Sequence, residues 1–264
     1  MPKLSFVIIV RNEEHNILRC LESVKTVADE IVVIDAMSTD NTVGICKANG
    51  CMVYQREFDG YGTQKQFAVD KASHDWVFSI DADEVVSEEL KIELAGMFGS
   101  LGNKVPGSAG EENGKAMPAG FNIHFSLFFM GKHLRYGGVG KEIHLRLFNR
   151  TRGGFTRVPV HEGIEVTGPV VQLKGRIIHY SYRDISHHLG KINTYTSQAA
   201  EGYGKQGRTF SKIWVALKFP TSFFSFYIIK RGFLDGYPGF MWSFLAAVYA
   251  TLKVAKTIEL NRKL

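Results

Sequence analysis

The sequence predicts an α/β fold with a mostly parallel sheet flanked by helices. Its first 98 residues alternate four apolar strand-like runs with four helical segments. The strand-like runs are apolar throughout, which is typical of parallel strands covered by helices on both faces. Residues 121–179 then carry further strand patterns, and the chain turns helical again from Arg183.

The N-terminal elements follow from periodicity and capping signals. Short apolar runs bounded by polar turns predict strands, and amphipathic segments predict helices. Ser38-Thr39-Asp40-Asn41 supplies capping residues before the second helix, and Ser87 with the acids after it starts the fourth. The expected strands are residues 4–10, 30–35, 51–55 and 76–80, and the expected helices are residues 14–24, 42–49, 63–72 and 88–98.

The remaining chain contains a loop, a mostly β portion and a helical portion. Residues 99–120 are rich in Gly, Ser, Pro, Asn and charge, which predicts a disordered loop. Helices are expected over residues 210–229 and 240–260. The expected strands of the β portion are residues 121–129, 144–148, 163–166, 170–173 and 176–179.

Composition narrows the function classes. A chain of 264 residues that is 45% hydrophobic can bury one full core, with or without an appendage. The net charge of +6 indicates an anionic partner such as nucleotide phosphates, nucleic acid or an acidic membrane surface. No basic block with interleaved aromatic residues marks a nucleic-acid groove, so we expect no nucleic-acid partner.

Cysteine usage and hydropathy indicate in which cellular compartment the protein is expected. Of the three cysteines, Cys20 and Cys46 fall in predicted amphipathic helices and are interpreted as buried apolar side chains, which fits a reducing cytoplasm. The N-terminus lacks the pattern of a signal peptide. The longest uncharged stretch, residues 236–252, is shorter than the ~20 apolar residues of a spanning helix, so no transmembrane helix is expected.

An acidic turn is the most informative motif. Asp81-Ala82-Asp83-Glu84 directly follows the strand-like run 76–80. Ligands of open α/β sheets bind at the carboxyl ends of the strands. Carboxylates so close together repel one another unless a cation lies between them, and Mg²⁺ or Mn²⁺ prefers such oxygen ligands. The turn therefore predicts a metal site, with a solvated turn before the next helix as the alternative.

Polar residues end the other strands at the same predicted edge. Arg11, Asn12 and Glu13 follow the first strand, and Asp35 ends the second. Asp35 is placed to hydrogen-bond a base or ribose, and Lys65 or Arg11 to meet a diphosphate. Taken singly, each is explained better by a structural role: a helix cap for Glu13 and residues 38–41, and a solvated surface charge for Lys65.

Together these motifs resemble glycosyltransferase family 2. The resemblance rests on the order and spacing of a polar turn after the first strand, a D-x-x-S-T-D-x-T segment after the second, and a DxD motif after the fourth. Here Ala36 stands where many members have a second acid, and Met37 replaces the usual glycine, which puts base selectivity in doubt. The matching segments are Arg11-Asn12-Glu13-Glu14, Asp35-Ala36-Met37-Ser38-Thr39-Asp40-Asn41-Thr42 and Asp81-Ala82-Asp83.

Further segments resemble a bacterial subgroup, the small β-glycosyltransferases of lipopolysaccharide core assembly. The similarity covers nearly the whole chain except residues 99–120. The segments that carry it are Gly60-Tyr61-Gly62-Thr63-Gln64-Lys65-Gln66-Phe67-Ala68, His74-Asp75-Trp76, Val160-His161-Glu162, His179-Tyr180-Ser181-Tyr182-Arg183 and Arg231-Gly232-Phe233-Leu234-Asp235-Gly236.

The resemblance implies a GT-A fold, a nucleotide-sugar donor, a divalent metal and inversion at the anomeric carbon. It implies that Asp83 holds Mg²⁺ or Mn²⁺, with Asp81 toward the metal or the ribose, and that Glu162 is the general base. The implied organisation is a nucleotide-sugar-binding half at 1–98, a loop at 99–120, an acceptor-side half at 121–182 and a helical region at 183–264. The expected substrate-binding residues are Arg11, Asn12, Glu13, Asp35, Lys65 and Asp81.

The C-terminal helices predict a membrane-associating extension. They are aromatic and fringed by lysine and arginine, which suits helices that lie in the interface of an anionic membrane, although packing on the rest of the domain is the alternative. We therefore expect a peripheral enzyme on the cytoplasmic face of the inner membrane that moves a hexose, first of all from a UDP-hexose, to a lipopolysaccharide core or related glycolipid. The alternatives are a polyprenyl-phosphate sugar synthase and a non-catalytic nucleotide- or membrane-binding scaffold.

Overall fold

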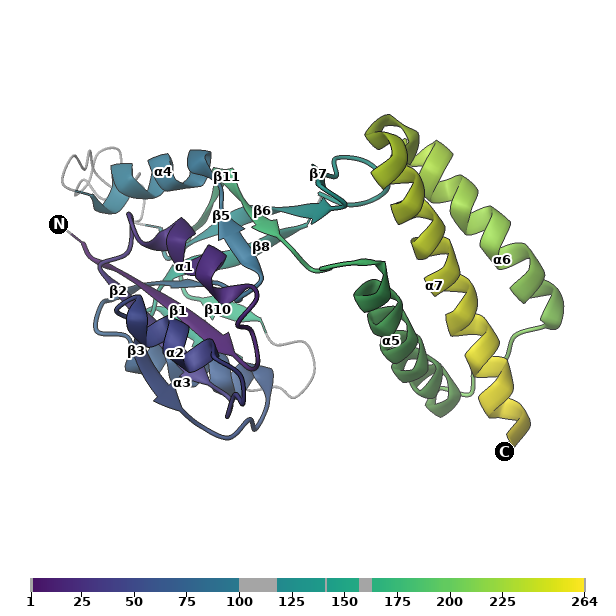
Figure 1. Cartoon of the computed structure of the whole chain (residues 1–264), viewed down its shortest axis with the longest axis horizontal. Coiled ribbons are helices and arrows are strands. Elements are labelled where there is room, and N and C mark those ends of the chain that lie inside the picture. Colours follow the sequence, from purple (N-terminus) through teal and green to yellow (C-terminus); the bar gives the residue numbers. More distant parts are fainter. Residues whose placement is uncertain (1, 100–117, 141, 157–162, 264) are drawn as a thin grey trace. The chain divides into compact units, whose positions relative to one another are not determined.

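The computed structural model of the chain describes residues 2–99, 118–140, 142–156 and 163–263 (Figure 1). The chain divides into two compact units, which are described in turn. The N-terminal unit comprises Met1–Phe125 and Glu142–His179, and the C-terminal unit comprises Ser126–Lys141 and Tyr180–Leu264.

Four parallel strands form one side of the sheet in the N-terminal unit. β1 pairs with β2 on one side and with β4 on the other, and β2 pairs with β3. Because these strands are parallel, their carboxyl ends share one edge of the sheet. The strands are β1 (Leu4–Val10), β2 (Glu30–Asp35), β3 (Met52–Gln55) and β4 (Trp76–Ser79).

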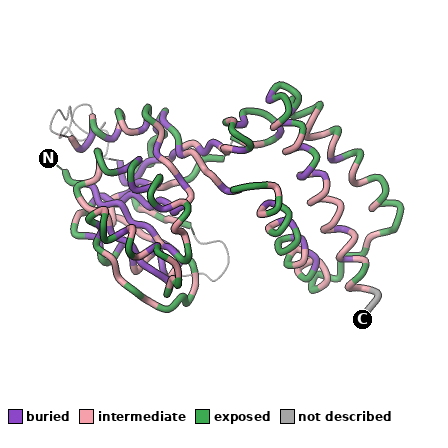
Figure 2. Tube along the Cα trace, viewed as in Figure 1, coloured by how far each residue is buried: buried purple, intermediate pink, exposed green. Residues whose placement is uncertain are grey.

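Helices cover both faces of this sheet. Alternate residues of β1 face opposite sides: Phe6 packs in a cluster with α1 and α4, and Val7 packs in a second cluster with α3. β1, β2 and β4 are the most continuously buried segments of the unit, whereas β3 is partly exposed (Figure 2). The helices are α1 (Ile17–Val24), α2 (Thr42–Ala48), α3 (Tyr61–Lys71) and α4 (Glu88–Phe98).

The second half of the sheet is antiparallel where its register is resolved. β8 pairs with β4, β6 pairs with β8, and β5 pairs with β11. The expected parallel arrangement thus holds for the first four strands, and the sheet as a whole is mixed. The strands are β5 (Glu84–Val86), β6 (Gly120–Phe129), β8 (Ile143–Asn149) and β11 (Val170–His179), with a separate two-stranded sheet of β9 (Gly153–Phe155) and β10 (Ile164–Val166).

The structure differs from the sequence predictions in several elements. α1 begins at Ile17, not at residue 14, because residues 14–16 form a turn in which the backbone N–H of Asn16 donates to the carbonyl of Glu13. β5, β7 and β9 were not predicted. The break expected between residues 173 and 176 is absent, since β11 runs through Gly175. A Cβ at Gly175 would lie 2.4 Å from Cα of Leu90, so glycine here permits the close packing of α4 on β11.

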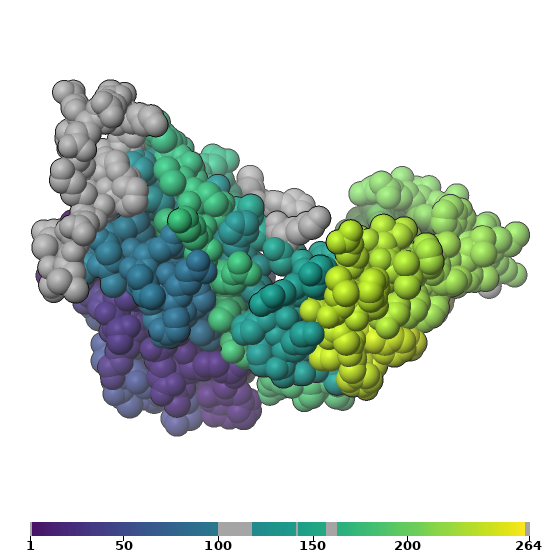
Figure 3. Space-filling view, turned by 90° about the horizontal axis from the view of Figure 1, so that it is seen from above, coloured from purple at the N-terminus to yellow at the C-terminus, as the bar shows by residue number. Residues whose placement is uncertain are grey.

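The C-terminal unit is helical apart from a hairpin strand. α7 packs against both α5 and α6, and Figure 1 shows it between them; in the space-filling view α7 is the yellow helix (Figure 3). Within the described residues, no helix has the length and apolarity needed to span a bilayer. The elements are β7 (Lys132–His133), α5 (Ile185–Lys205), α6 (Lys212–Phe224), a π-helix (Ser225–Ile229), a 3₁₀-helix (Gly232–Asp235) and α7 (Gly236–Lys263).

A buried carboxylate organises the loop that follows β7. Asp235 is 2% exposed and accepts hydrogen bonds from the backbone N–H groups of Arg135 and Tyr136, both at 2.9 Å. Nε1 of Trp242 donates to the carbonyl of Gly137 in the same loop. The segment 231–236, which resembles a bacterial subgroup, thus holds the loop after β7 through Asp235.

Candidate active site at the carboxyl edge of the sheet

Asp35 ends β2 as a fully buried carboxylate. Its oxygens accept hydrogen bonds from the backbone N–H of Ser38, at 3.1 and 3.3 Å, and from Nε2 of Gln55, at 3.0 Å. Gln55 stands directly beside it in the parallel register of β2 and β3. Asp35 therefore fixes the loop after β2 and orients an amide side chain at the strand edge.

Asn12 links the loops after β1 and β2. Its backbone N–H donates to Oγ of Ser38, and its Oδ1 accepts from the backbone N–H of Thr39, both at 2.8 Å. Glu13 donates its backbone N–H to Oγ1 of Thr42. These contacts make the two loops one polar rim, at which Arg11 is exposed.

Two residues of this rim adopt left-handed backbone conformations. Asn12 has φ 55° and Met37 has φ 58°. Asparagine tolerates this region, but methionine does so at a cost that glycine avoids. The glycine that family members usually carry at the position of Met37 therefore has a conformational reason.

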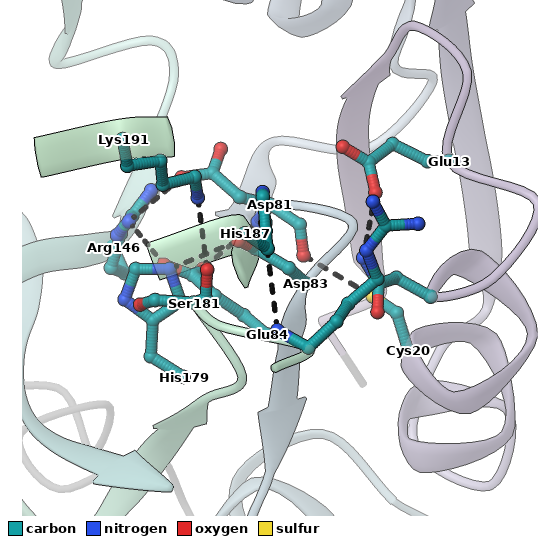
Figure 4. A network of polar contacts seen from close by, with 12 residues as sticks. Glu13, Cys20, Asp81, Asp83, Glu84, Arg146, His179, Ser181, His187 and Lys191 are labelled. Carbon is teal, nitrogen blue, oxygen red and sulfur yellow. Dashed lines mark hydrogen bonds and ion pairs between the residues drawn. The ribbon is translucent and has the colours of Figure 1, made fainter. Parts of the chain in front are cut away.

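Asp81 lies between two cationic side chains. Nζ of Lys65 is 3.0 Å from its Oδ1. Nη2 of Arg146 is 3.2 Å from its Oδ2 (Figure 4). Burial alone would raise the pKa of the Asp81 carboxyl, but these two cations hold that pKa well below its usual range. Asp81 is thus firmly ionised, and Lys65 meets it in this structure.

Glu84 holds the backbone of the acidic turn in place. It is 1% exposed, its Oε2 accepts the backbone N–H of Asp81 at 2.8 Å, and its Oε1 accepts Nη2 of Arg146 at 2.8 Å. Burial, together with the charge of Asp81, raises the pKa of Glu84, while Arg146 opposes that shift. Glu84 therefore fixes both the backbone of the turn and the guanidinium that pairs with it.

Asp83 has a different environment from Asp81. Its Oδ2 lies 3.2 Å from Nε2 of His179, and no lysine or arginine pairs with it among the described residues. The antiparallel register of β5 with β11 sets Glu84 opposite His179, which brings the imidazole to the turn. Burial lowers the pKa of His179, but the hydrogen bond to Asp83 and the charges of Asp83, Glu84 and Asp81 together raise that pKa overall.

The donor chemistry of Asp83 and His179 suits a divalent metal. A carboxylate oxygen and an imidazole nitrogen are both ligands for Mn²⁺, and a carboxylate is the usual protein ligand for Mg²⁺. Within the described residues, no group of three or more His, Cys, Asp or Glu side chains is arranged to hold a metal ion. The two residues would therefore supply only part of a coordination shell, with substrate and water oxygens completing it.

Arg146 is the site residue that sequence reasoning missed. It lies in β8, whose strand was predicted, and its guanidinium carbon is 5.1 Å from the ring centre of Phe125. An arginine alternating with apolar residues in a strand was the available signal. The cation required by the clustered carboxylates is thus partly supplied by the chain itself.

The predicted base, Glu162, and the neighbouring His161 lie outside the described residues, so their place in the site stays a prediction. Cys20 and Cys46 are buried free thiols, as expected. The sulfur of Cys20 lies 3.5 Å from the carbonyl oxygen of Asp81, beneath the acidic turn.

Comparison with known proteins identifies the family. The profile of Glycosyl transferase family 2 matches residues 5–109. A glycosyltransferase of Rickettsia typhi is 32% identical over 100% of this chain and 89% of its own length. The chain belongs to glycosyltransferase family 2. It is accordingly a glycosyltransferase, with a sheet and flanking helices of the GT-A type.

The chain is also similar to a lipopolysaccharide core glycosyltransferase and to a solved sugar-transferring enzyme. The lipopolysaccharide core biosynthesis glycosyltransferase LpsC of Rhizobium meliloti is 30% identical over 98% of this chain and 94% of its own length. Glucosyl-3-phosphoglycerate synthase from Mycobacterium tuberculosis, solved with Mn²⁺ and uridine diphosphate, is 23% identical over 49% of this chain and 45% of its own, with a TM-score of 0.33.

Proposed function

We propose that this glycosyltransferase moves a hexose from a UDP-hexose to a lipopolysaccharide core or related glycolipid, with inversion and with Mg²⁺ or Mn²⁺. The observation that carries the proposal is the division of labour in the acidic turn. Asp81 and Glu84 are engaged by Lys65 and Arg146, whereas Asp83 faces only His179 among the described residues. One carboxylate of the turn is thereby kept for a ligand.

The donor is held by residues at the strand ends. Asp83 with His179 would hold the divalent cation, which when bound neutralises the charge that builds on the leaving diphosphate. Asp81 would lie toward the ribose or the metal. Lys65, which pairs with Asp81 in this structure, would meet the diphosphate of the bound donor.

The polar rim provides the nucleoside end of the proposed donor site. Asp35 and Gln55 are hydrogen-bonded to each other at the strand ends beside the rim. Asn12 and Glu13 hydrogen-bond the loop after β1 to the loop after β2. Arg11 is exposed at this rim, as expected of a phosphate contact. A rim pre-formed by hydrogen bonds lowers the ordering cost of nucleotide binding.

Glu162 is the proposed general base. Inversion requires a group that takes the proton of the acceptor hydroxyl on the face opposite the leaving diphosphate. Glu162→Gln is expected to lower kcat by about 10²- to 10⁴-fold while donor affinity stays unchanged. Steady-state transfer assays and calorimetry with UDP measure the two quantities.

Glu165→Gln is the matched control, since this exposed glutamate lies three residues away in β10. It should leave both quantities as in the wild type. Near-normal turnover of Glu162→Gln would contradict the base assignment. It would favour a polyprenyl-phosphate acceptor, whose phosphate oxygen needs little help from a base.

A glycolipid acceptor requires access to a membrane, and the C-terminal unit has a surface that suits one. Large apolar side chains are exposed along α6, the π-helix and the start of α7, with Ile213 at 71% and Ile229 at 67%. Lys212, Lys230 and Arg231 are exposed among them. Apolar residues fringed by cations favour binding in the interface of an anionic bilayer. We call this the interfacial surface; it comprises Ile213, Trp214, Leu217, Phe224, Ile228, Ile229, Phe233, Leu234 and Tyr237.

A further inference from the structure

A pocket of about 320 Å³ lies within the C-terminal unit. Its lining residues recur at helical spacing along α5 and α7, so the facing stripes of two packed helices form its walls. The stripe of α7 includes two alanines, Ala246 and Ala250. Small residues at this contact leave the helices a hollow instead of a filled core.

One wall of the pocket is aromatic. The imidazole of His188 stacks on Tyr182, with ring centres 3.7 Å apart, and on Trp242, with ring centres 5.7 Å apart. The lining also includes the aliphatic residues Ile192 and Leu245, both of which are buried. Such surroundings favour an apolar occupant.

His188 carries an unsatisfied polar atom at this wall. The residue is 4% exposed, and its Nδ1 is buried without a hydrogen-bond partner in the described structure. Burial, reinforced by the charge of Lys191, lowers the pKa of His188 to about 4, so the imidazole is neutral at pH 7. Buried polar atoms normally find a partner, and a ligand oxygen would supply one.

Two lysines give the pocket its charge. Nζ of Lys191 donates to the carbonyl of Ser181, and Nζ of Lys253 lies 5.3 Å from the ring centre of Tyr203. Neither lysine pairs with a carboxylate among the described residues, and the pocket lining contains no acidic residue. The uncompensated positive charge favours an anionic group in the occupant.

We propose that this pocket binds a single-chain anionic amphiphile. The hydrocarbon chain would lie along Ile192, Leu245 and the two alanines. The anionic headgroup would meet Lys191 and Lys253. The volume equals that of roughly ten liquid waters at about 30 Å³ each, which suits a chain of a similar number of methylenes.

The proposal goes beyond the transfer reaction and does not depend on it. Every residue used belongs to the C-terminal unit, and none is among the donor-binding residues. Binding can therefore be measured without donor, acceptor or membrane. A failure of transfer activity would leave this binding unchanged, and a failure of binding would leave the assignment of the acidic turn unchanged.

The test is calorimetric titration of the full chain with dodecyl phosphate below its critical micelle concentration. We expect binding at one site per chain. Dodecyl maltoside, which has the chain without the charge, should bind at least tenfold more weakly, and inorganic phosphate, the charge without the chain, should not bind. Ala246→Phe fills the hollow and should reduce the affinity for dodecyl phosphate at least tenfold.

Lys191→Ala should lower the affinity for dodecyl phosphate by about tenfold and leave the affinity for dodecyl maltoside unchanged, because only the charged headgroup loses a charge-assisted contact. Lys205→Ala, an exposed lysine of α5 outside the pocket, is the matched control. If Ala246→Phe does not unfold cooperatively, the smaller change Ala250→Leu replaces it. Wild-type affinity in both the filled-pocket and the Lys191 variants, or full competition by inorganic phosphate, would overturn the proposal.

Discussion

The two units of this glycosyltransferase distribute apolar and charged side chains in opposite ways. In the N-terminal unit the large apolar residues of the sheet, such as Phe6, Phe78 and Phe121, are fully buried, and charge gathers at one edge. In the C-terminal unit large apolar residues such as Ile213 and Ile229 are exposed. One unit is built around an enclosed core with a polar rim, and the other offers apolar surface and a hollow.

The contrast assigns different physical tasks to the two units. Buried, paired charges at the acidic turn create a pre-organised polar site, which suits a charged and hydrophilic donor. Exposed apolar side chains cost solubility and are retained where they bind something apolar. The proposed transfer from a water-soluble nucleotide-sugar to a glycolipid would use both kinds of surface.

The largest expected effect concerns the charge network of the N-terminal unit. Arg146→Ala leaves Asp81 and Glu84 without their shared cation, and unpairing a buried charge costs about 3–5 kcal/mol of unfolding free energy. Urea denaturation followed by circular dichroism measures it. Arg176→Ala, an exposed arginine of β11, should change stability by less than about 0.5 kcal/mol. A loss below about 1 kcal/mol for Arg146→Ala would show that the network is not buried in this way.

The second effect concerns the interfacial surface. Replacing both Ile213 and Ile229 by Asn should weaken binding to phosphatidylglycerol vesicles by about tenfold or more, because less apolar area enters the bilayer. Co-sedimentation with vesicles measures the affinity. Ile92→Asn is the matched control, since Ile92 is 73% exposed on α4 of the other unit. Equal sedimentation of the double variant and the wild type would contradict membrane binding through the interfacial surface.

The smallest expected effect comes from backbone strain at one methionine in each unit. Met37 and Met130 both have left-handed backbones, with φ of 58° and 50°. Replacing either by Gly should raise the unfolding free energy by about 1 kcal/mol, because glycine adopts this conformation without the steric cost. Met52→Gly, at the start of strand β3, should lower it instead. Thermal denaturation gives the sign, and a destabilised Met37→Gly would contradict the strain argument.

The sequence predicted most of the first 98 residues because the strands there are short apolar runs and the second and fourth helices begin after clear capping residues. It missed β5, β7 and β9 because strands of two or three residues carry no periodicity of their own. It missed Arg146 because the role of that side chain depends on which strands become neighbours. The pairing of His179 with Asp83 arises likewise from the register of β5 with β11.

The acidic turn shows the limit of local sequence most clearly. Its carboxylates indicated a cation, and the structure supplies two from distant parts of the chain, Lys65 and Arg146. Local sequence does not show which of Asp81 and Asp83 meets these cations. That distinction comes only from the three-dimensional arrangement, and the metal assignment depends on it.

The most direct test of the account is the metal dependence of UDP binding to wild type and to Asp83→Asn. Calorimetry with Mn²⁺, and again with EDTA, should show that Mn²⁺ strengthens UDP binding to the wild type. In Asp83→Asn the affinity in Mn²⁺ should fall at least tenfold, since even changes next to metal ligands cost about 10- to 100-fold. Asp59→Asn, an exposed acid before α3, should behave as the wild type. Equal UDP affinity in Mn²⁺ and EDTA, or an unchanged affinity in Asp83→Asn, would contradict the assignment of the metal to Asp83.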